Sequence, residues 1–192
     1  MAQPPKGLTW SDDGNTFYKM EDGGISAYKL PGFSKEMIVS KQDLMPSGEP
    51  ASLKIRNFFF SSDHNKILIY TNSKKVWRYN TKGDYWVLNV QNHSLKQLGK
   101  SLPASSLMFA KFSPDNSKVA YVSNQNIYVE DLSSGKITQV TKDGTDYLIN
   151  GTFDWAYEEE FGCRDGFRWS PDSKFIAYWQ IDASKIKNYL ML

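Results

Sequence analysis

The sequence predicts an all-β fold: a β-propeller fragment of about three and a half four-stranded antiparallel blades. Aromatic residues make up 15% of the 192 residues, and aromatic side chains favour strands. A short phrase recurs four times, beginning at Trp10, Phe60, Phe112 and Trp169, which lie 50, 52 and 57 residues apart. Short apolar stretches separated by turn residues fill the intervals. Four such stretches at this period are typical of a propeller blade.

The repeated phrase consists of an aromatic residue, a serine and, two residues later, an aspartate. Its copies occupy residues 9–18, 59–70, 111–122 and 168–179, with the aspartates at Asp13, Asp63, Asp115 and Asp172. We expect the aromatic residue to be buried at the end of a strand. The serine and aspartate oxygens then cap backbone amides in a tight turn, and an antiparallel strand returns.

The third unit shows its strands most clearly. Residues 105–112, 118–123, 126–132 and 136–141 are apolar or β-branched, and polar turns separate them. A β-sandwich also contains short strands, but it does not account for the repeated phrase. The propeller is therefore the preferred prediction.

Propellers close with about four to eight blades, and this chain supplies only about three and a half. It ends in an apolar, strand-like segment at residues 188–192. Exposed strand edges invite aggregation. We therefore expect residues 1–192 to be the N-terminal portion of a longer propeller, with self-association or further blades covering the edges.

Composition and motifs argue against several classes of function. The net charge is only +2 and no basic run occurs, so we expect no nucleic-acid partner. No apolar run approaches the length of a membrane span. The single cysteine, Cys163, forms neither an internal disulfide nor a cysteine-rich zinc site, and we expect a half-buried thiol.

The chain also lacks the sequence motifs of a nucleophile elbow, a zinc protease or a phosphate-binding loop. Its two histidines, His64 and His93, lie in polar turn segments and are expected to be solvated. We expect no catalytic residue, no metal ligand and no cofactor site in this chain.

An acidic run is the most unusual local feature. Glu158, Glu159 and Glu160 are consecutive, and the flanking aromatics at 153–161 are of types that should be buried. A solvated turn, or a short helix whose N-terminus favours carboxylates, is the simpler interpretation. The segment lies between two blades, however, where a plain connection needs only a few residues. Long inter-blade loops are where propellers carry function.

A second candidate is Arg78, in the stretch VWRYN. It occupies the expected hairpin between the strands at 67–72 and 85–90. An exposed hairpin arginine is by itself unremarkable.

Together these stretches resemble the propeller of the dipeptidyl peptidase IV family, in the prolyl oligopeptidase clan of serine peptidases. The phrase DWAYEEEF at 154–161, the following RWSPDSKFIAYW, and VWRYN occur in the family's order and spacing. The resemblance covers essentially the whole chain, but only the first half of the family's eight-bladed propeller. The Cys-Arg-Asp stretch at 163–165 has no counterpart to which a role is assigned.

The resemblance implies a function for three residues. Glu159 and Glu160 bind the free N-terminal ammonium of a peptide, and Arg78 reaches the same pocket and binds a substrate carbonyl. The Ser-Asp-His triad belongs to a C-terminal α/β-hydrolase domain absent from this chain, so the fragment alone is expected to be inactive. Glu158 is left out of the ammonium site.

The expected function is therefore substrate recognition in a serine exopeptidase that releases Xaa-Pro-type dipeptides, or tripeptides, from peptide N-termini. Its expected partners are peptides with a free N-terminus, its own hydrolase domain and a second copy in a homodimer. The family implies a periplasmic, secreted or cell-surface location. The alternatives are a catalytically inactive propeller that binds peptides or proteins, and a structural TolB-like propeller, which leaves the acidic phrase unexplained.

Overall fold

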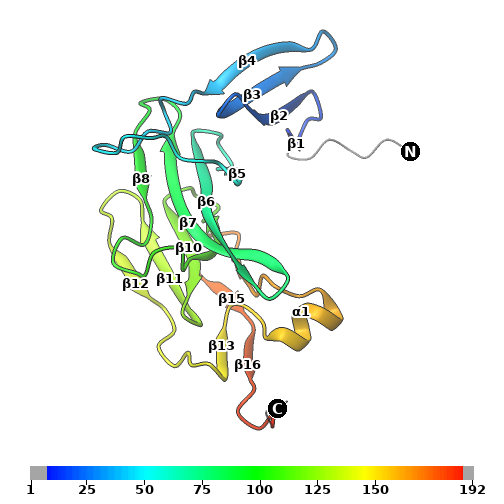
Figure 1. Ribbon diagram of the computed structural model, residues 1–192, viewed down its shortest axis with the longest axis vertical. Helices are drawn as coiled ribbons and strands as arrows, with labels where there is room; N and C mark the ends of the chain where they lie inside the picture. The colour runs from blue at the N-terminus through cyan, green and yellow to red at the C-terminus, as the bar shows by residue number, and fades with distance from the viewer. Residues whose placement is uncertain (1–7, 188–192) are drawn as a thin grey trace. The chain divides into compact units, whose positions relative to one another are not determined.

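The computed structural model describes residues 8–187 and divides them into two compact units (Figure 1). The described part of unit 1 comprises residues 8–72 and 85–98, and that of unit 2 comprises 73–84 and 99–187. The apolar segment predicted at 188–192 lies outside the described residues.

Unit 1 begins with a four-stranded antiparallel sheet in sequential order, β1 (Leu8–Trp10), β2 (Thr16–Glu21), β3 (Gly24–Lys29) and β4 (Ser34–Val39). A second sequential sheet contains β5 (Asn57–Phe60), β6 (Lys66–Val76), β7 (Tyr79–Asn89) and β8 (Leu95–Gln97). Alternate apolar residues of these strands form one buried cluster that includes Ile25, Val39, Phe58, Ile67, Ile69 and Leu88. The tip of the β6–β7 hairpin belongs to unit 2.

Unit 2 contains a third sequential sheet, β9 (Met108–Phe112), β10 (Lys118–Ser123), β11 (Asn126–Asp131) and β12 (Ile137–Gln139). Two pairs follow: β13 (Leu148–Asn150) with β16 (Gln180–Asp182), and β14 (Phe167–Trp169) with β15 (Ile176–Tyr178). The seven-residue helix α1 (Trp155–Phe161) lies between β13 and β14 (Figure 1). Three four-stranded sheets and a two-stranded start of a fourth confirm the predicted propeller fragment.

The four serine–aspartate turns have one hydrogen-bond pattern. In the third copy, the Oγ of Ser113 donates to Oδ1 of Asp115 (2.6 Å) and accepts from the amide of Lys118 (3.0 Å). The same carboxylate oxygen accepts from the amide of Ser117 (3.1 Å). Equivalent bonds occur from Ser11, Ser61 and Ser170. The capping predicted from the repeated phrase is thus confirmed.

The expectation that the aromatic of each phrase is buried is wrong. Trp10 is 53% exposed, and Phe60, Phe112 and Trp169 are only partly buried. The cause for Trp10 is its place on β1, the edge strand of its sheet, where its ring packs mainly against Phe17 on the paired strand β2 (5.4 Å between centroids).

The two histidines lie in exposed turns, as predicted. His64 stacks on Phe60, with 4.8 Å between ring centroids. His93 is not simply solvated, because its Nδ1 lies 2.8 Å from Oδ1 of Asp43. Cys163 is partly buried, and its Sγ donates to the carbonyl oxygen of Phe161 (3.7 Å). None of the helices within residues 8–187 has the length and apolar character needed to cross a membrane.

Candidate functional site

Helix α1 carries the acidic run, and its two ends explain why it forms. Asp154 is the N-cap, and its Oδ1 accepts from the amide of Tyr157 (3.0 Å). Gly162 ends the helix in the left-handed conformation, with φ of 65°, which glycine adopts without strain. Its amide donates to the carbonyl of Glu158 (3.1 Å). The run is therefore a short capped helix, one of the two local structures expected from the simpler interpretation, although not all of its carboxylates lie in water as that interpretation assumed.

The three glutamates differ sharply in environment, because successive helical residues point about 100° apart. The residue Glu158 is only 5% exposed, and the side chain of Glu159 is 9% exposed. Glu160 is exposed. Burial raises the pKa of Glu158, while nearby Arg164 partly opposes the shift and Glu159 adds to it.

The expectation that the aromatics around the run are buried is wrong for most of them. Phe153, before the helix, is buried, but Trp155, Tyr157 and Phe161 are exposed, Phe161 by 71%. The reason is that the helix lies on the surface and buries Glu158 instead of these rings. The Tyr157 ring stacks on that of Phe153 (5.5 Å between centroids) and meets that of Phe161 at a tilt (5.6 Å).

Arg78 and Glu159 come together in unit 2. Trp77 and Arg78 form the two-residue turn between β6 and β7, with Trp77 at φ 49°. The Nε of Arg78 lies 2.6 Å from Oε2 of Glu159. The other oxygen of Glu159, Oε1, is buried and has no hydrogen-bond partner among residues 8–187. The structure thus places Arg78 against Glu159, whereas Glu160, the next residue of α1, is exposed and forms no ion pair with a residue between 8 and 187.

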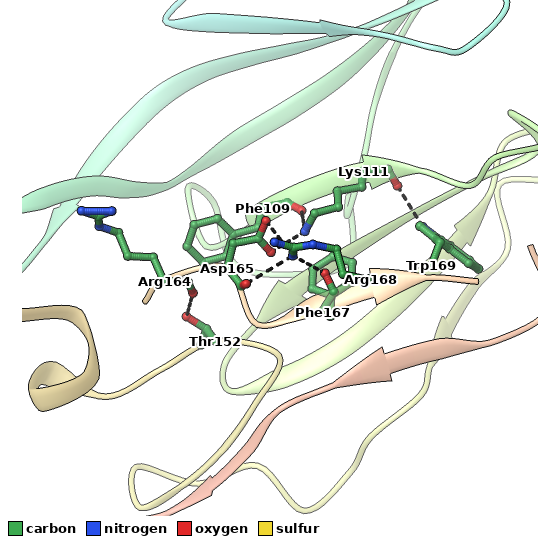
Figure 2. Close-up of polar contacts among 8 residues, drawn as sticks. All are labelled: Phe109, Lys111, Thr152, Arg164, Asp165, Phe167, Arg168 and Trp169. Atoms are coloured by element: carbon green, nitrogen blue, oxygen red, sulfur yellow. Dashed lines mark hydrogen bonds and ion pairs between the residues drawn. The ribbon is translucent and has the colours of Figure 1, made fainter. Parts of the chain in front are cut away.

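A stem closes the segment that carries α1. The Oγ1 of Thr152 donates to the carbonyl of Arg164 (2.8 Å), and Thr152 and Asp165 form an antiparallel bridge (Figure 2). Gly166 donates to the carbonyl of Gly151 (3.0 Å). A Cβ at Gly166 would lie 2.9 Å from the carbonyl carbon of Gly151, so this approach requires glycine.

Arg164 connects the stem to the hairpin. Its guanidinium lies 3.7 Å from the centre of the Tyr79 ring, and Figure 2 shows its side chain extending away from Asp165. Cation–π contacts of this kind are favourable, the more so when water is excluded. Because Tyr79 follows Arg78 directly, this contact steadies the hairpin turn next to the helix.

Asp165 joins the stem to β9 through an ion-pair cluster (Figure 2). Its Oδ1 contacts Nζ of Lys111, and its Oδ2 lies 3.1 Å from Nη1 of Arg168. The Lys111 ammonium also lies 3.6 Å from the centre of the Phe167 ring. Burial lowers the pKa of Lys111 to about 8, although Asp165 acts in the opposite direction.

Sequence reasoning assigned no role to Arg164 and Asp165. The only local signal was that 163–165 follows the acidic run and carries two charges of opposite sign. Their partners Tyr79 and Lys111 are far away in the sequence. Across residues 8–187, no three His, Cys, Asp or Glu side chains are grouped as metal ligands. What the arrangement offers chemically is a buried carboxylate oxygen, next to an arginine, that accepts hydrogen bonds from a cationic donor.

Comparisons with known proteins agree on one family. A family model described as the dipeptidyl peptidase IV (DPP IV) N-terminal region matches residues 61–192. The probable dipeptidyl-aminopeptidase B of Aspergillus clavatus is 35% identical over 134 residues, 69% of this chain and 15% of that protein. The corresponding protein of Aspergillus terreus is 29% identical over 179 residues, 93% of this chain and 20% of that protein.

A solved structure extends the match to the first blade. The crystal structure of Porphyromonas gingivalis dipeptidyl peptidase 4 superposes with a TM-score of 0.85 at 28% identity, covering 95% of this chain and 26% of that one. The chain therefore spans between about a seventh and a quarter of the length of these relatives.

Proposed function

The chain belongs to the dipeptidyl peptidase IV family, as part of its N-terminal region, and from this premise we propose that it recognises substrate for a serine exopeptidase. In this proposal the full-length enzyme releases Xaa-Pro-type dipeptides, or tripeptides, from peptide N-termini. Glu159 and Glu160 bind the substrate ammonium, and Arg78 binds a backbone carbonyl of the same peptide.

The observation that carries the proposal is the state of the Glu159 carboxylate. One oxygen is paired with Arg78 at 2.6 Å, and the other is buried without a partner in the described part of the chain. Leaving a buried acceptor unpaired costs about 1–3 kcal/mol, and more when it is charged. A ligand that donates a charge-assisted hydrogen bond to Oε1 removes that cost, which favours an ammonium at this place.

A peptide N-terminus has the right chemistry for this oxygen. Its pKa is near 8, so it carries three N–H donors at neutral pH. One donor reaches Oε1 of Glu159, and exposed Glu160 swings in to accept a second. With the amine fixed, only the peptide bond a set distance away reaches a nucleophile, so the anchor selects the bond by position.

Arg78 has two tasks in this arrangement. Its guanidinium offsets the repulsion between neighbouring carboxylates while engaging Glu159 only through Nε. The side chain is 72% exposed, which leaves its terminal nitrogens directed to solvent and able to donate to a substrate carbonyl. The contact of Arg164 with Tyr79, the residue after Arg78, supports the hairpin turn that carries this guanidinium.

The test is a pair of substitutions in the full-length polypeptide, Glu159→Gln and Glu160→Gln. With an Xaa-Pro chromogenic substrate that has a free amine, kcat/KM should fall at least about 30-fold in the Glu159 variant. This corresponds to the lower end of the 2–5 kcal/mol lost when one partner of a buried charge pair is removed. Glu49→Gln, an exposed glutamate of unit 1, is the matched control and should leave kcat/KM unchanged.

Unchanged kcat/KM in both glutamate variants would contradict the proposal that Glu159 and Glu160 bind the substrate ammonium. Bond cleavage is assigned to residues beyond this chain, so purified 1–192 should not turn over the substrate. The full-length sequence separates the enzyme from a silent binding module, since a G-x-S-x-G after the propeller is required for the enzyme.

A further inference from the structure

Glu158 is the charged group that the proposed function does not use. It is 5% exposed, its Oε1 is buried, and that oxygen has no hydrogen-bond partner within residues 8–187. Nearly all buried polar atoms in native proteins are paired, so each exception asks for an explanation. Helix capping does not supply one, because the N-terminal amide of Tyr157 is bonded to Asp154.

Glu158 is one of the residues that line a cavity of about 190 Å³ in unit 2. The walls come from the β6–β7 hairpin, β9, the turn between β10 and β11, and the stem that carries α1, and they include Trp77, Met108, Gln125, Phe153 and Glu158. A water molecule takes about 30 Å³ of liquid volume, so the space exceeds what one bridging water fills. The cavity is therefore large enough for a small organic molecule.

The charged side chains that line the cavity limit the class of ligand that it can bind. Two acidic side chains, Glu158 and Asp146, and one basic side chain, Lys82, line the cavity, so the formal charge of the lining is −1. An anion is disfavoured by this sign, and a neutral apolar molecule leaves Oε1 unpaired. A bare metal ion lacks ligands, since the described chain groups no three metal-ligating side chains.

A small organic cation satisfies each of these conditions. Its N–H groups donate to the carboxylate of Glu158, and charge-assisted bonds of this kind are the stronger ones. Its carbon skeleton lies against Met108 and Phe153, and the Trp77 ring offers an aromatic face to the positive charge. We propose that the cavity beside Glu158 binds a protonated alkylamine or a guanidinium ion, at a site separate from the carboxylate of Glu159.

The site has a reporter of its own. Met108 is buried and lines the cavity, so the methyl signal of [methyl-¹³C]methionine at this position, identified with Met108→Leu, reports occupancy directly. The full-length polypeptide is titrated with n-butylammonium chloride, with guanidinium chloride at sub-denaturing concentration, and with sodium chloride and 1-butanol as controls. We expect a saturable shift with the two organic cations and none with either control.

Three variants locate the binding. Glu158→Gln should weaken the apparent affinity at least about tenfold, the change that corresponds to losing one good interaction. The distant Glu49→Gln should leave the Met108 titration unchanged, whereas Glu159→Gln, whose charge acts on Glu158 only from beside it, should weaken the affinity less than Glu158→Gln does. Trp77→Ala, on the partly exposed hairpin turn, should weaken it severalfold and gives a second measure if Glu158→Gln does not fold.

Each other outcome overturns the proposal. An absent shift, an equal shift with 1-butanol, or an affinity that survives both Glu158→Gln and Trp77→Ala rules out the cation site. A titration lost in Glu159→Gln but kept in Glu158→Gln means that the cation is bound at the proposed substrate ammonium site. That result rejects this inference while supporting the proposed function, so the experiment tests the two proposals independently.

Discussion

The serine–aspartate turns and the segment around α1 use carboxylates in opposite ways. In the turns each aspartate accepts hydrogen bonds from its neighbours, and those from Ser61 and Ser113 lower the pKa of Asp63 and of Asp115 to about 2. Around α1, Glu158 and Glu159 each keep a buried oxygen without a partner, and the pKa of Glu158 is raised by burial. Hydrogen-bonded acids thus stabilise the turns of the blades, whereas the acids with an unpaired buried oxygen are the ones for which we propose ligands.

The largest effect that separates the two regions should come from Arg78→Met in the full-length polypeptide. Removing this arginine leaves both oxygens of Glu159 unpaired. The transition state for free-amine substrates should then be bound about 2–5 kcal/mol less tightly, and kcat/KM should fall accordingly. Stability should also fall, by about 1–3 kcal/mol, because the side chain of Glu159 is only 9% exposed and loses the partner of its second oxygen. Steady-state kinetics and denaturant unfolding measure the two effects.

Arg56→Met is the matched control for this variant. Arg56 is an exposed arginine of unit 1, and its substitution should alter neither quantity. A loss of stability in Arg78→Met large enough to explain its loss of activity would remove the distinction between the regions, since the acidic segment would then be structural as well.

The turns should show the reverse behaviour. Ser113→Ala removes the donor to Asp115 and the acceptor for the Lys118 amide, so local stability should fall by about 2 kcal/mol. Hydrogen exchange of the peptide covering 111–123 measures it. Ser117→Ala, an exposed hydroxyl in the same turn that also bonds Asp115, should cost no more than about 0.5 kcal/mol. Equal losses in both would show that the buried serine is not the organising residue.

The turns were predictable from the sequence because their partners are neighbours. Serine, aspartate and the capped amide lie within six residues, so the repeated phrase alone predicts the bonds. The burial of the aromatics was not predictable in the same way. Whether Trp10 is covered depends on its place on an edge strand, and whether Phe161 is covered depends on how α1 lies on the surface.

The candidate site depends on distant contacts. Arg78 and Glu159 are 81 residues apart, and spacing does not bring them together. Only the resemblance to a family predicted that they share a site. The contacts of Arg164 with Tyr79 and of Asp165 with Lys111 went unpredicted for the same reason. The contrast between Glu158 and Glu159, which are largely buried, and exposed Glu160 follows from how α1 lies on the surface, which the run of identical residues does not reveal.

The smallest expected effect concerns the stem. Its charges are paired, like those of the turns, but partly buried, like those of α1. The pKa of Lys111 is about 8 in the folded chain, below its usual 10.5. Between these values the unfolded chain binds more protons, so stability should rise with pH. From pH 8 to 9.5, wild type should gain about 1 kcal/mol relative to Lys111→Met, after allowance for partial solvent exposure.

Denaturant unfolding at the two pH values measures this gain, and Lys136→Met, at an exposed lysine, should show no such difference from wild type. NMR of the Lys111 side chain tests the cause. In Asp165→Asn its pKa should fall below about 8, because the carboxylate that favours the charged form is gone. An unchanged pKa of Lys111 in Asp165→Asn would mean that the Asp165 contact does not hold the stem to β9. The stem would then depend on the close packing of Gly166 against Gly151 and on the hydrogen bond of Thr152 alone.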